Sequence, residues 1–152
     1  MSRSPLPRLV AAVVLGFALP FIAAAQEPAA ALPRTKSPAG AKAYIVSPAN
    51  GATVKGPVTV VFGLKGMGIA PAGMAFEGAG HHHLLVDTSL PANVGQPLPA
   101  TDKIIHFGKG QTETTLTLPP GRHTLQLVLG DMLHIPFDPV VASDVVTITV
   151  AP

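Results

Sequence analysis

The sequence predicts an all-β domain, an antiparallel β-sandwich of about seven strands. Short runs rich in β-branched and aromatic residues alternate between apolar and polar side chains, and they are separated by Gly, Pro and Asn turn formers. Outside the first 25 residues, no stretch shows the helical period. A closed barrel of roughly eight strands is the second choice, because the same pattern of short strands suits it.

The expected strands follow one another without an internal repeat. The segment 57–65 shows the pattern most clearly: Val58, Val60 and Phe62 share one face, as expected for a strand that lines a core. Between the strands, 47–51 and 119–121 contain Pro, Asn and Gly and are read as turns, while 66–80 and 89–102 are read as long loops. The expected strands are 44–46, 57–65, 81–88, 111–118, 123–129 and 145–150, while 52–55 continues the edge and 103–107 is a short apolar piece.

The N-terminal part is expected to lie outside the folded domain. Residues 1–25 combine Arg3 and Arg8 with an apolar run that ends in alanines, which is the pattern of a cleavable signal peptide. Residues 26–42 are mostly Ala, Pro, Lys, Ser and Gly and are expected to form a flexible linker. The domain is therefore expected over 43–152, in a periplasmic or secreted protein with no membrane span after cleavage.

Composition excludes several classes of function. Removal of Arg3 and Arg8 with the leader leaves eight of the 10 basic residues against 8 acidic ones, so the mature chain has no basic patch for nucleic acid. There is no Cys, so disulfides, thiolate nucleophiles and thiolate metal ligands are absent. With no Trp and one Tyr, a carbohydrate-binding surface is also disfavoured.

Several segments together resemble a bacterial periplasmic family of unknown function, the DUF4399 type. The resemblance covers roughly 44–150 and implies a small secreted domain of immunoglobulin-like type, without an established activity. Members are sometimes labelled rod shape-determining proteins, but one cleavable apolar segment cannot supply the several spans of such a membrane protein. The segments are Ser47-Pro-Ala-Asn-Gly-Ala, Phe62-Gly-Leu-Lys-Gly-Met-Gly-Ile-Ala-Pro-Ala-Gly, Gly80-His-His-His-Leu-Leu-Val-Asp, Ile105-His-Phe-Gly-Lys-Gly-Gln-Thr-Glu and Pro120-Gly-Arg-His-Thr-Leu-Gln-Leu-Val-Leu-Gly-Asp-Met-Leu-His-Ile-Pro.

The run 81–83 of three histidines is the main candidate for a functional site. Residues two apart in a strand share a face, so His81 and His83 are expected to project together, while His82 points to the opposite face with Leu84 and Val86. Two imidazoles on one face suit copper, zinc or nickel. The sequence therefore predicts a histidine-rich metal site that begins at this strand.

More distant residues are expected to complete the ligand set. All 6 histidines lie between residues 81 and 134, so His106, His123 and His134 are candidates, together with the thioether of Met132. Because thioethers are soft ligands, a mixed His and Met set favours copper, as Cu(I) or Cu(II), over zinc. The predicted function is sequestration or delivery of copper, with the metal ion and another periplasmic protein as partners.

A structural interpretation remains open beside the metal site. The histidines could form a hydrogen-bonded cluster in a non-catalytic interaction domain, and His123 in particular lies on a leucine-rich face. Met67 and Met74 could simply fill packing gaps. Asp87 and Asp131 could cap turns or orient imidazoles.

Catalysis is the weaker class of function. The sequence contains no Gly-x-Ser-x-Gly elbow, no His-Glu-x-x-His helix and no phosphate-binding loop. Metal-dependent hydrolysis stays open, because a histidine site with a free position could activate water.

Overall fold

The structure, a computed structural model, describes residues 32–152. The predicted signal peptide, 1–25, and the first part of the predicted linker lie outside this range. Within 32–152, no helix is long and apolar enough to cross a membrane.

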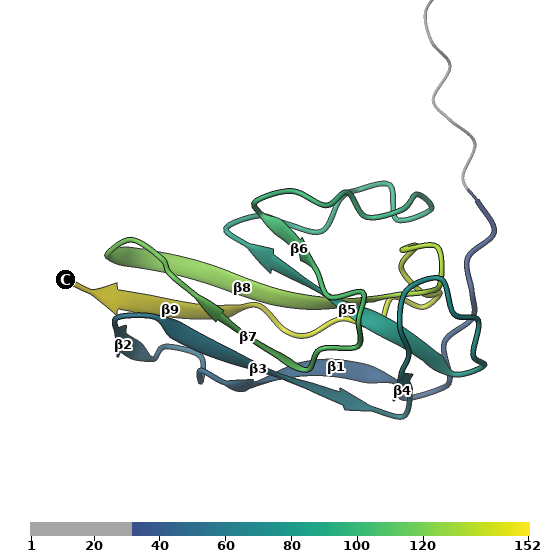
Figure 1. The fold of residues 1–152 in the computed structure, drawn as a ribbon, viewed down its shortest axis with the longest axis horizontal. Coiled ribbons are helices and arrows are strands. Elements are labelled where there is room, and N and C mark those ends of the chain that lie inside the picture. Colours follow the sequence, from purple (N-terminus) through teal and green to yellow (C-terminus); the bar gives the residue numbers. More distant parts are fainter. Residues whose placement is uncertain (1–31) are drawn as a thin grey trace, which may run out of the picture.

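Two β-sheets pack face to face across one main core (Figure 1). This arrangement confirms the predicted immunoglobulin-like β-sandwich. The smaller sheet has the order β1 (Lys42–Ser47), β3 (Val58–Lys65) and β7 (Glu113–Leu116). The larger sheet has the order β2 (Thr53–Lys55), β9 (Val146–Ala151), β8 (Gly121–Gly130), β5 (Ala79–Val86) and β4 (Gly68–Ile69), and β6 (Ile104–His106) also pairs with β5.

Most strand pairs are antiparallel, but the two short edge strands differ. β2 pairs with β9, and β4 with β5, in parallel. β4 lies inside the stretch 66–80, which the sequence pattern predicts as a loop. Its two residues are too few to show an alternation, so no periodic signal announces it.

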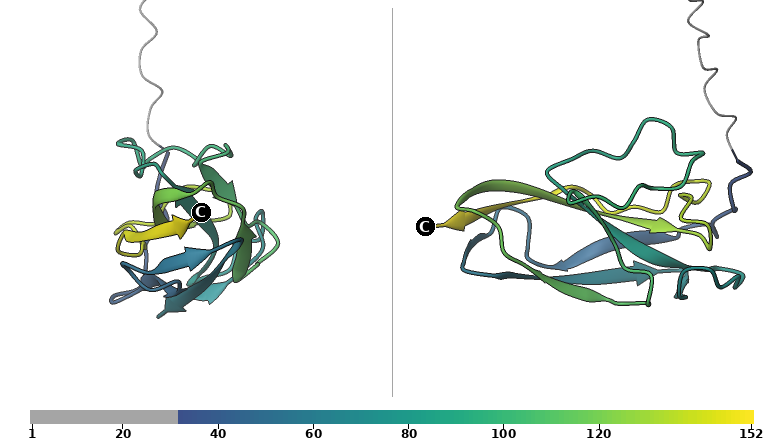
Figure 2. Two further views of the ribbon diagram at one scale, coloured as in Figure 1. Left: turned by 90° about the vertical axis from the view of Figure 1, so that its left-hand side faces the viewer. Right: turned by 45° about the horizontal axis from the view of Figure 1, so that its top comes forward.

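The main core lies between the two sheets. Val58, Val60 and Phe62 of β3 are buried, as the alternation predicts, and the facing side chains come from β5, β8 and β9. A second, smaller apolar cluster covers the outer face of the larger sheet and contains Leu85, Leu98, Ile104 and Val128. Figure 2 shows the loop between β5 and β6 lying over this outer face. β5 is therefore buried on both faces, which places its histidines away from bulk solvent.

Residues 34–38 are fastened to the loop at 131–139, although their composition places them in the predicted linker. Arg34 donates hydrogen bonds to the carbonyl oxygens of Pro136 and Phe137. The Thr35 hydroxyl donates to Asp131 at 2.7 Å, and the Asp138 amide donates to the Thr35 carbonyl oxygen at 2.9 Å. We call residues 34–38 the N-terminal strap.

Candidate metal centre

The alternation of β5 places its three histidines as the sequence predicts. His82 points into the main core, where its ring meets the ring of Phe62 edge-on with centroids 5.2 Å apart. His81 and His83 point to the outer face, and their ring centroids lie 4.8 Å apart. All three residues are almost completely buried.

The pairing of β5 with β6 brings a third imidazole to the outer face. In the register of these strands, His106 lies opposite His83, and the two ring centroids are 5.2 Å apart. The His106 ring also lies 5.0 Å from that of His81. The three outer-face rings therefore form one group.

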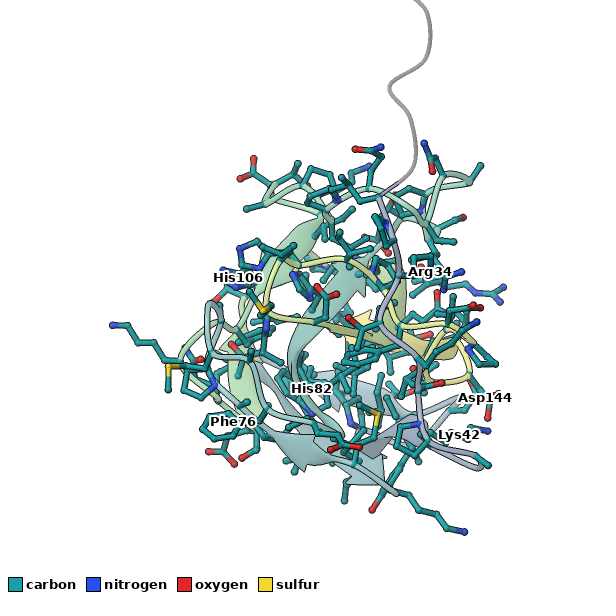
Figure 3. All side chains as sticks on the ribbon, turned by 90° about the vertical axis from the view of Figure 1, so that its right-hand side faces the viewer. Arg34, Lys42, Phe76, His82, His106 and Asp144 are labelled. Atoms are coloured by element: carbon teal, nitrogen blue, oxygen red, sulfur yellow. The ribbon has the colours of Figure 1, made fainter. Side chains whose placement is uncertain are left out.

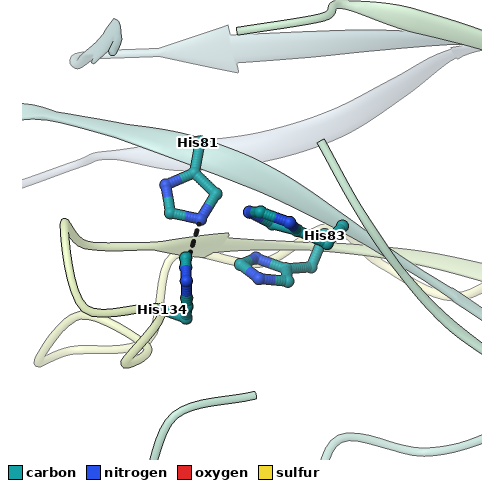
Figure 4. A group of neighbouring side chains, drawn as sticks. His81, His83 and His134 are labelled. Atoms are coloured by element: carbon teal, nitrogen blue, oxygen red, sulfur yellow. Dashed lines mark hydrogen bonds between the residues drawn. The ribbon is translucent and has the colours of Figure 1, made fainter. Parts of the chain in front are cut away.

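A tight turn after β8 supplies the fourth imidazole. The Asp131 carboxylate accepts hydrogen bonds from the backbone N–H groups of Leu133 at 2.9 Å and Ile135 at 3.0 Å, which holds the turn closed. Within it, His134 adopts a left-handed backbone with φ of 67°, which is uncommon for a residue other than glycine. This conformation accompanies a 3.0 Å hydrogen bond between His134 Nδ1 and His81 Nε2 (Figure 4).

Two glycines leave room for these rings. A Cβ at Gly130 would lie 2.7 Å from His83 Cε1, and a Cβ at Gly108 would lie 2.3 Å from His106 Cε1. Both distances are too short for any real Cβ contact. The rings of His83 and His106 therefore fit beside Gly130 and Gly108 only because glycine has no side chain.

The resulting histidine cluster consists of His81, His83, His106 and His134. Each residue can offer one ring nitrogen such that all four nitrogens lie within 4.8 Å of one another. In a tetrahedral site with metal–nitrogen bonds of about 2.0–2.1 Å, ligand nitrogens are about 3.3 Å apart. The cluster could therefore hold a metal ion after a small inward movement of the rings, or remain a hydrogen-bonded group.

Burial favours the uncharged form of three imidazoles of the cluster, those of His81, His83 and His106. Loss of hydration, together with the neighbouring imidazoles, lowers the pKa of His81 to about 4 and that of His83 to about 3. The Asp131 carboxylate opposes the shift at His81. Burial, and then His134, also lower the pKa of His106. At neutral pH these rings are uncharged, and each carries one N–H group and one lone pair.

Several buried ring nitrogens have no hydrogen-bond partner. Among residues 32–152 they are His81 Nδ1, His82 Nδ1, His83 Nδ1 and His106 Nε2. Three of the four belong to the histidine cluster. Buried polar atoms are nearly always satisfied in proteins, so this concentration marks a place where a ligand could supply the missing interactions.

The structure does not bring every candidate ligand into the cluster. His123 Nδ1 bonds to Asp87 at 2.7 Å and its Nε2 bonds to the Pro119 carbonyl oxygen at 2.9 Å, so both ring nitrogens are engaged elsewhere. Met132 lines a neighbouring pocket together with Met74. Asp131 closes the turn that carries His134.

The sequence pattern gave no reason to single out Gly108 or Gly130. Each is one of 15 glycines. Their proximity to the imidazoles becomes visible only when the strand registers are known.

Comparison with known proteins gives a family but no activity. One similar solved structure is described as "Structures of Clostridium thermocellum CbhA fibronectin(III)-like modules"; it is 12% identical, covers 71% of this chain and 92% of that chain, and has a TM-score of 0.38. That score is too low to carry an argument, and the fold rests on the strand pairing itself. No curated protein matches the chain. The family model "Domain of unknown function (DUF4399)" matches residues 60–151, which include all four histidines of the cluster. Because the match spans more than half of the sequence, the chain belongs to the DUF4399 family.

Proposed function

We propose that this protein binds one transition-metal ion, copper, at the histidine cluster and acts in copper sequestration or delivery as a periplasmic or secreted module. The observation that carries the proposal is the convergence of four imidazoles from β5, β6 and the turn after β8, with ligand nitrogens within 4.8 Å of one another. Two of these residues, His81 and His83, are fully buried.

The hydrogen bonding favours an ion over a purely structural cluster. Among residues 32–152, the cluster has a single internal hydrogen bond, which joins His81 and His134. Each buried nitrogen without a partner costs on the order of 1–3 kcal/mol. An ion that accepts the lone pairs and turns the N–H groups outward would offset part of this cost.

The donor set favours copper among the candidate metals. Neutral imidazoles suit copper, zinc and nickel alike, and divalent copper binds such nitrogen sites most tightly. The sequence contains no cysteine, which limits the soft ligands to methionine thioethers. Met74 and Met132 line a pocket beside the cluster, as expected near a site that handles copper.

The proposed compartment rests on the leader pattern of residues 1–25. Delivery would require another periplasmic protein as donor or acceptor.

Metal uptake by purified protein tests the proposal. Tag-free protein expressed from the full-length sequence is expected to retain about one copper ion per chain after desalting, as measured by elemental analysis. His81→Ala/His83→Ala should lose this copper because two of the four ligands are gone. His82→Leu is the matched control, since the His82 ring faces the main core and its loss leaves the cluster intact.

Circular dichroism would confirm that each variant folds. Equal copper uptake by the double variant and the unchanged protein would contradict the proposal.

The hydrogen bond between His81 and His134 supports a second candidate function, an interaction domain stabilised by a metal-free histidine cluster. In that case the double variant is less stable than the unchanged protein by the same amount with and without copper. A melting temperature that rises with copper only when the cluster is intact would exclude this candidate.

A further inference from the structure

A pocket of about 240 Å³ lies beside the histidine cluster. Met74, Phe76 and Glu77 line it from the loop between β4 and β5, and Asp131 and Met132 line it from the turn after β8. Figure 3 looks at this end of the molecule. Phe76 and His106 lie on the left of that view, and Lys42 and Asp144 lie on the right.

The two methionines of the pocket are unusually exposed. Met74 is 49% exposed and Met132 is 40% exposed, whereas Met67 packs against the main core. Met67 therefore has the ordinary role of filling a gap in packing. Met74 and Met132 leave their apolar side chains in contact with water, and both line the same pocket.

The pocket is connected to the histidine cluster through the backbone. The Gly73 amide donates to the Met132 carbonyl oxygen at 3.1 Å, which ties the two methionine-bearing loops together. The Ala72 amide donates to the Gly108 carbonyl oxygen at 2.9 Å, which ties the same loop to the turn that leaves room for His106. Met132 also lies two residues before His134 in the sequence.

The side chains of the pocket suit a soft monovalent cation. Thioether sulfur is a soft ligand that selects Cu(I) over Zn²⁺, Mg²⁺ or Ca²⁺. The carboxylates of Glu77 and Asp131 add negative charge to the lining, and Phe76 adds an aromatic ring that can attract a cation with its face.

We infer that Met74 and Met132 form a capture site for Cu(I), from which the ion passes to the histidine cluster. Its role as a capture site rests on the proposed function, because the cluster is the destination of the ion. The transfer exchanges thioether ligands for imidazole ligands, and the ion stays Cu(I) throughout. No electron or proton therefore has to be supplied.

The test uses Ag(I) and Cu(I) as probes of the thioethers and Co(II) as a separate probe of the imidazoles. Full-length, tag-free protein is labelled with ¹³C at the methionine methyl groups and titrated with Ag(I), then with Cu(I) under anaerobic conditions. The methyl resonances of Met74 and Met132 should shift, and that of Met67 should not. The double variant Met74→Leu/Met132→Leu preserves side-chain volume and should weaken Cu(I) binding by at least about tenfold in a chelator competition. Met67→Leu is the matched control and should bind normally.

Co(II) distinguishes the two proposals, because its visible absorption reports imidazole coordination in the histidine cluster. The double methionine variant should bind Co(II) as the unchanged protein does. Methionine shifts without any Co(II) binding would establish the thioether site and contradict the proposed function. Co(II) binding with unshifted methionines, or unchanged Cu(I) affinity in the leucine variant, would overturn the capture site. In that outcome the pocket would be left to an apolar side chain of a partner protein.

Discussion

Gly130 leaves the space that the histidine cluster needs. The ring of His83 fills the space that any larger residue at 130 would need, and Gly108 has the same relation to His106. Neither glycine has a positive φ, so neither is required for its backbone conformation. Both are needed for the space they leave.

Gly130→Ala should therefore destabilise the protein and disturb the cluster. The added Cβ would lie 2.7 Å from His83 Cε1 and 3.3 Å from His134 Cα, so the ring or the turn must move. Overpacking of this kind costs about 1–3 kcal/mol in the free energy of unfolding, measurable by urea denaturation. Co(II) affinity should fall in the same variant.

Gly68→Ala is the control for this substitution. A Cβ at position 68 would meet Ala79 at 3.6 Å, which is ordinary contact. An equal loss of stability in both variants would show that flexibility, and not space, explains the effect at Gly130.

At the scale of single residues, the sequence predicts part of the cluster. The facing of His81 and His83 follows from the two-residue period of a strand, and the structure agrees. The position of His106 depends on a register between strands far apart in the sequence. That of His134 depends on a left-handed φ that its residue type does not indicate. Both are tertiary outcomes, so no local pattern contains them.

At the scale of elements, β5 organises both the core and the cluster. One face of this strand places His82, Leu84 and Val86 in the main core, and the other carries His81 and His83 beside Leu85 in the outer apolar cluster. The sequence predicts the two faces of the strand. It does not predict that the second face is covered, because the covering loop lacks regular structure and is rich in proline.

The end of β5 is joined to β8 by an ion pair between Asp87 and His123. Hydrogen bonds to Asp87 and to the Pro119 carbonyl oxygen raise the pKa of His123 above its ordinary value of 6.5. Burial acts to raise the pKa of Asp87, but hydrogen bonds from His123 and the Thr124 amide outweigh it and hold that pKa below its ordinary 3.8. Lys103 also lowers the pKa of Asp87.

These shifts fix the pH range in which the pair stabilises the fold. The raised pKa of His123 gives a contribution that is complete below pH 6.5 and is lost as pH rises through the folded-state pKa. The lowered pKa of Asp87 gives a contribution to stability that is complete above pH 3.8 and is lost as pH falls through the folded-state pKa of Asp87. The full effect therefore lies between these two values.

Asp87→Asn should lower the free energy of unfolding most between about pH 4 and 6.5. Asn tolerates the left-handed φ of 51° at this position and still accepts the Thr124 amide, so the variant removes mainly the charge. Urea denaturation measures the free energy of unfolding of the variant and of the unchanged protein across pH. Both proteins contain the buried histidine cluster, so its titration cancels in the difference between them. A difference that is constant from pH 5 to pH 9 would contradict the assignment.

At the scale of the whole molecule, the cluster joins three segments that are distant in sequence. Its imidazoles come from β5, β6 and the turn after β8, and β5 and β8 are central strands of the larger sheet. An ion bound there would link the outer covering of that sheet to its centre. Sandwich architecture could be predicted from strand patterns alone, whereas this linkage could not, because it depends on which loops fold over the outer face.

Metal should therefore stabilise the complete fold. An ion that binds only the native state adds about 2.7 kcal/mol to the free energy of unfolding when its free concentration is 100 times its Kd. Cu(II), which suits imidazoles and not the soft thioethers of the pocket, should raise the melting temperature in scanning calorimetry, and a chelator should reverse the rise. His81→Ala/His83→Ala should show no such dependence, and an equal rise in that variant would place the ion elsewhere.

The N-terminal strap supports the turn that carries His134. Thr35 donates a hydrogen bond to the same Asp131 carboxylate that closes the turn carrying His134, so the strap supports the position of the fourth imidazole. A truncation at residue 43, where composition alone would begin the domain, would remove that support while leaving every histidine in place. Attachment to a carrier or fusion to another protein at the strap would therefore bear on His134, which lies about one hundred residues further along the chain.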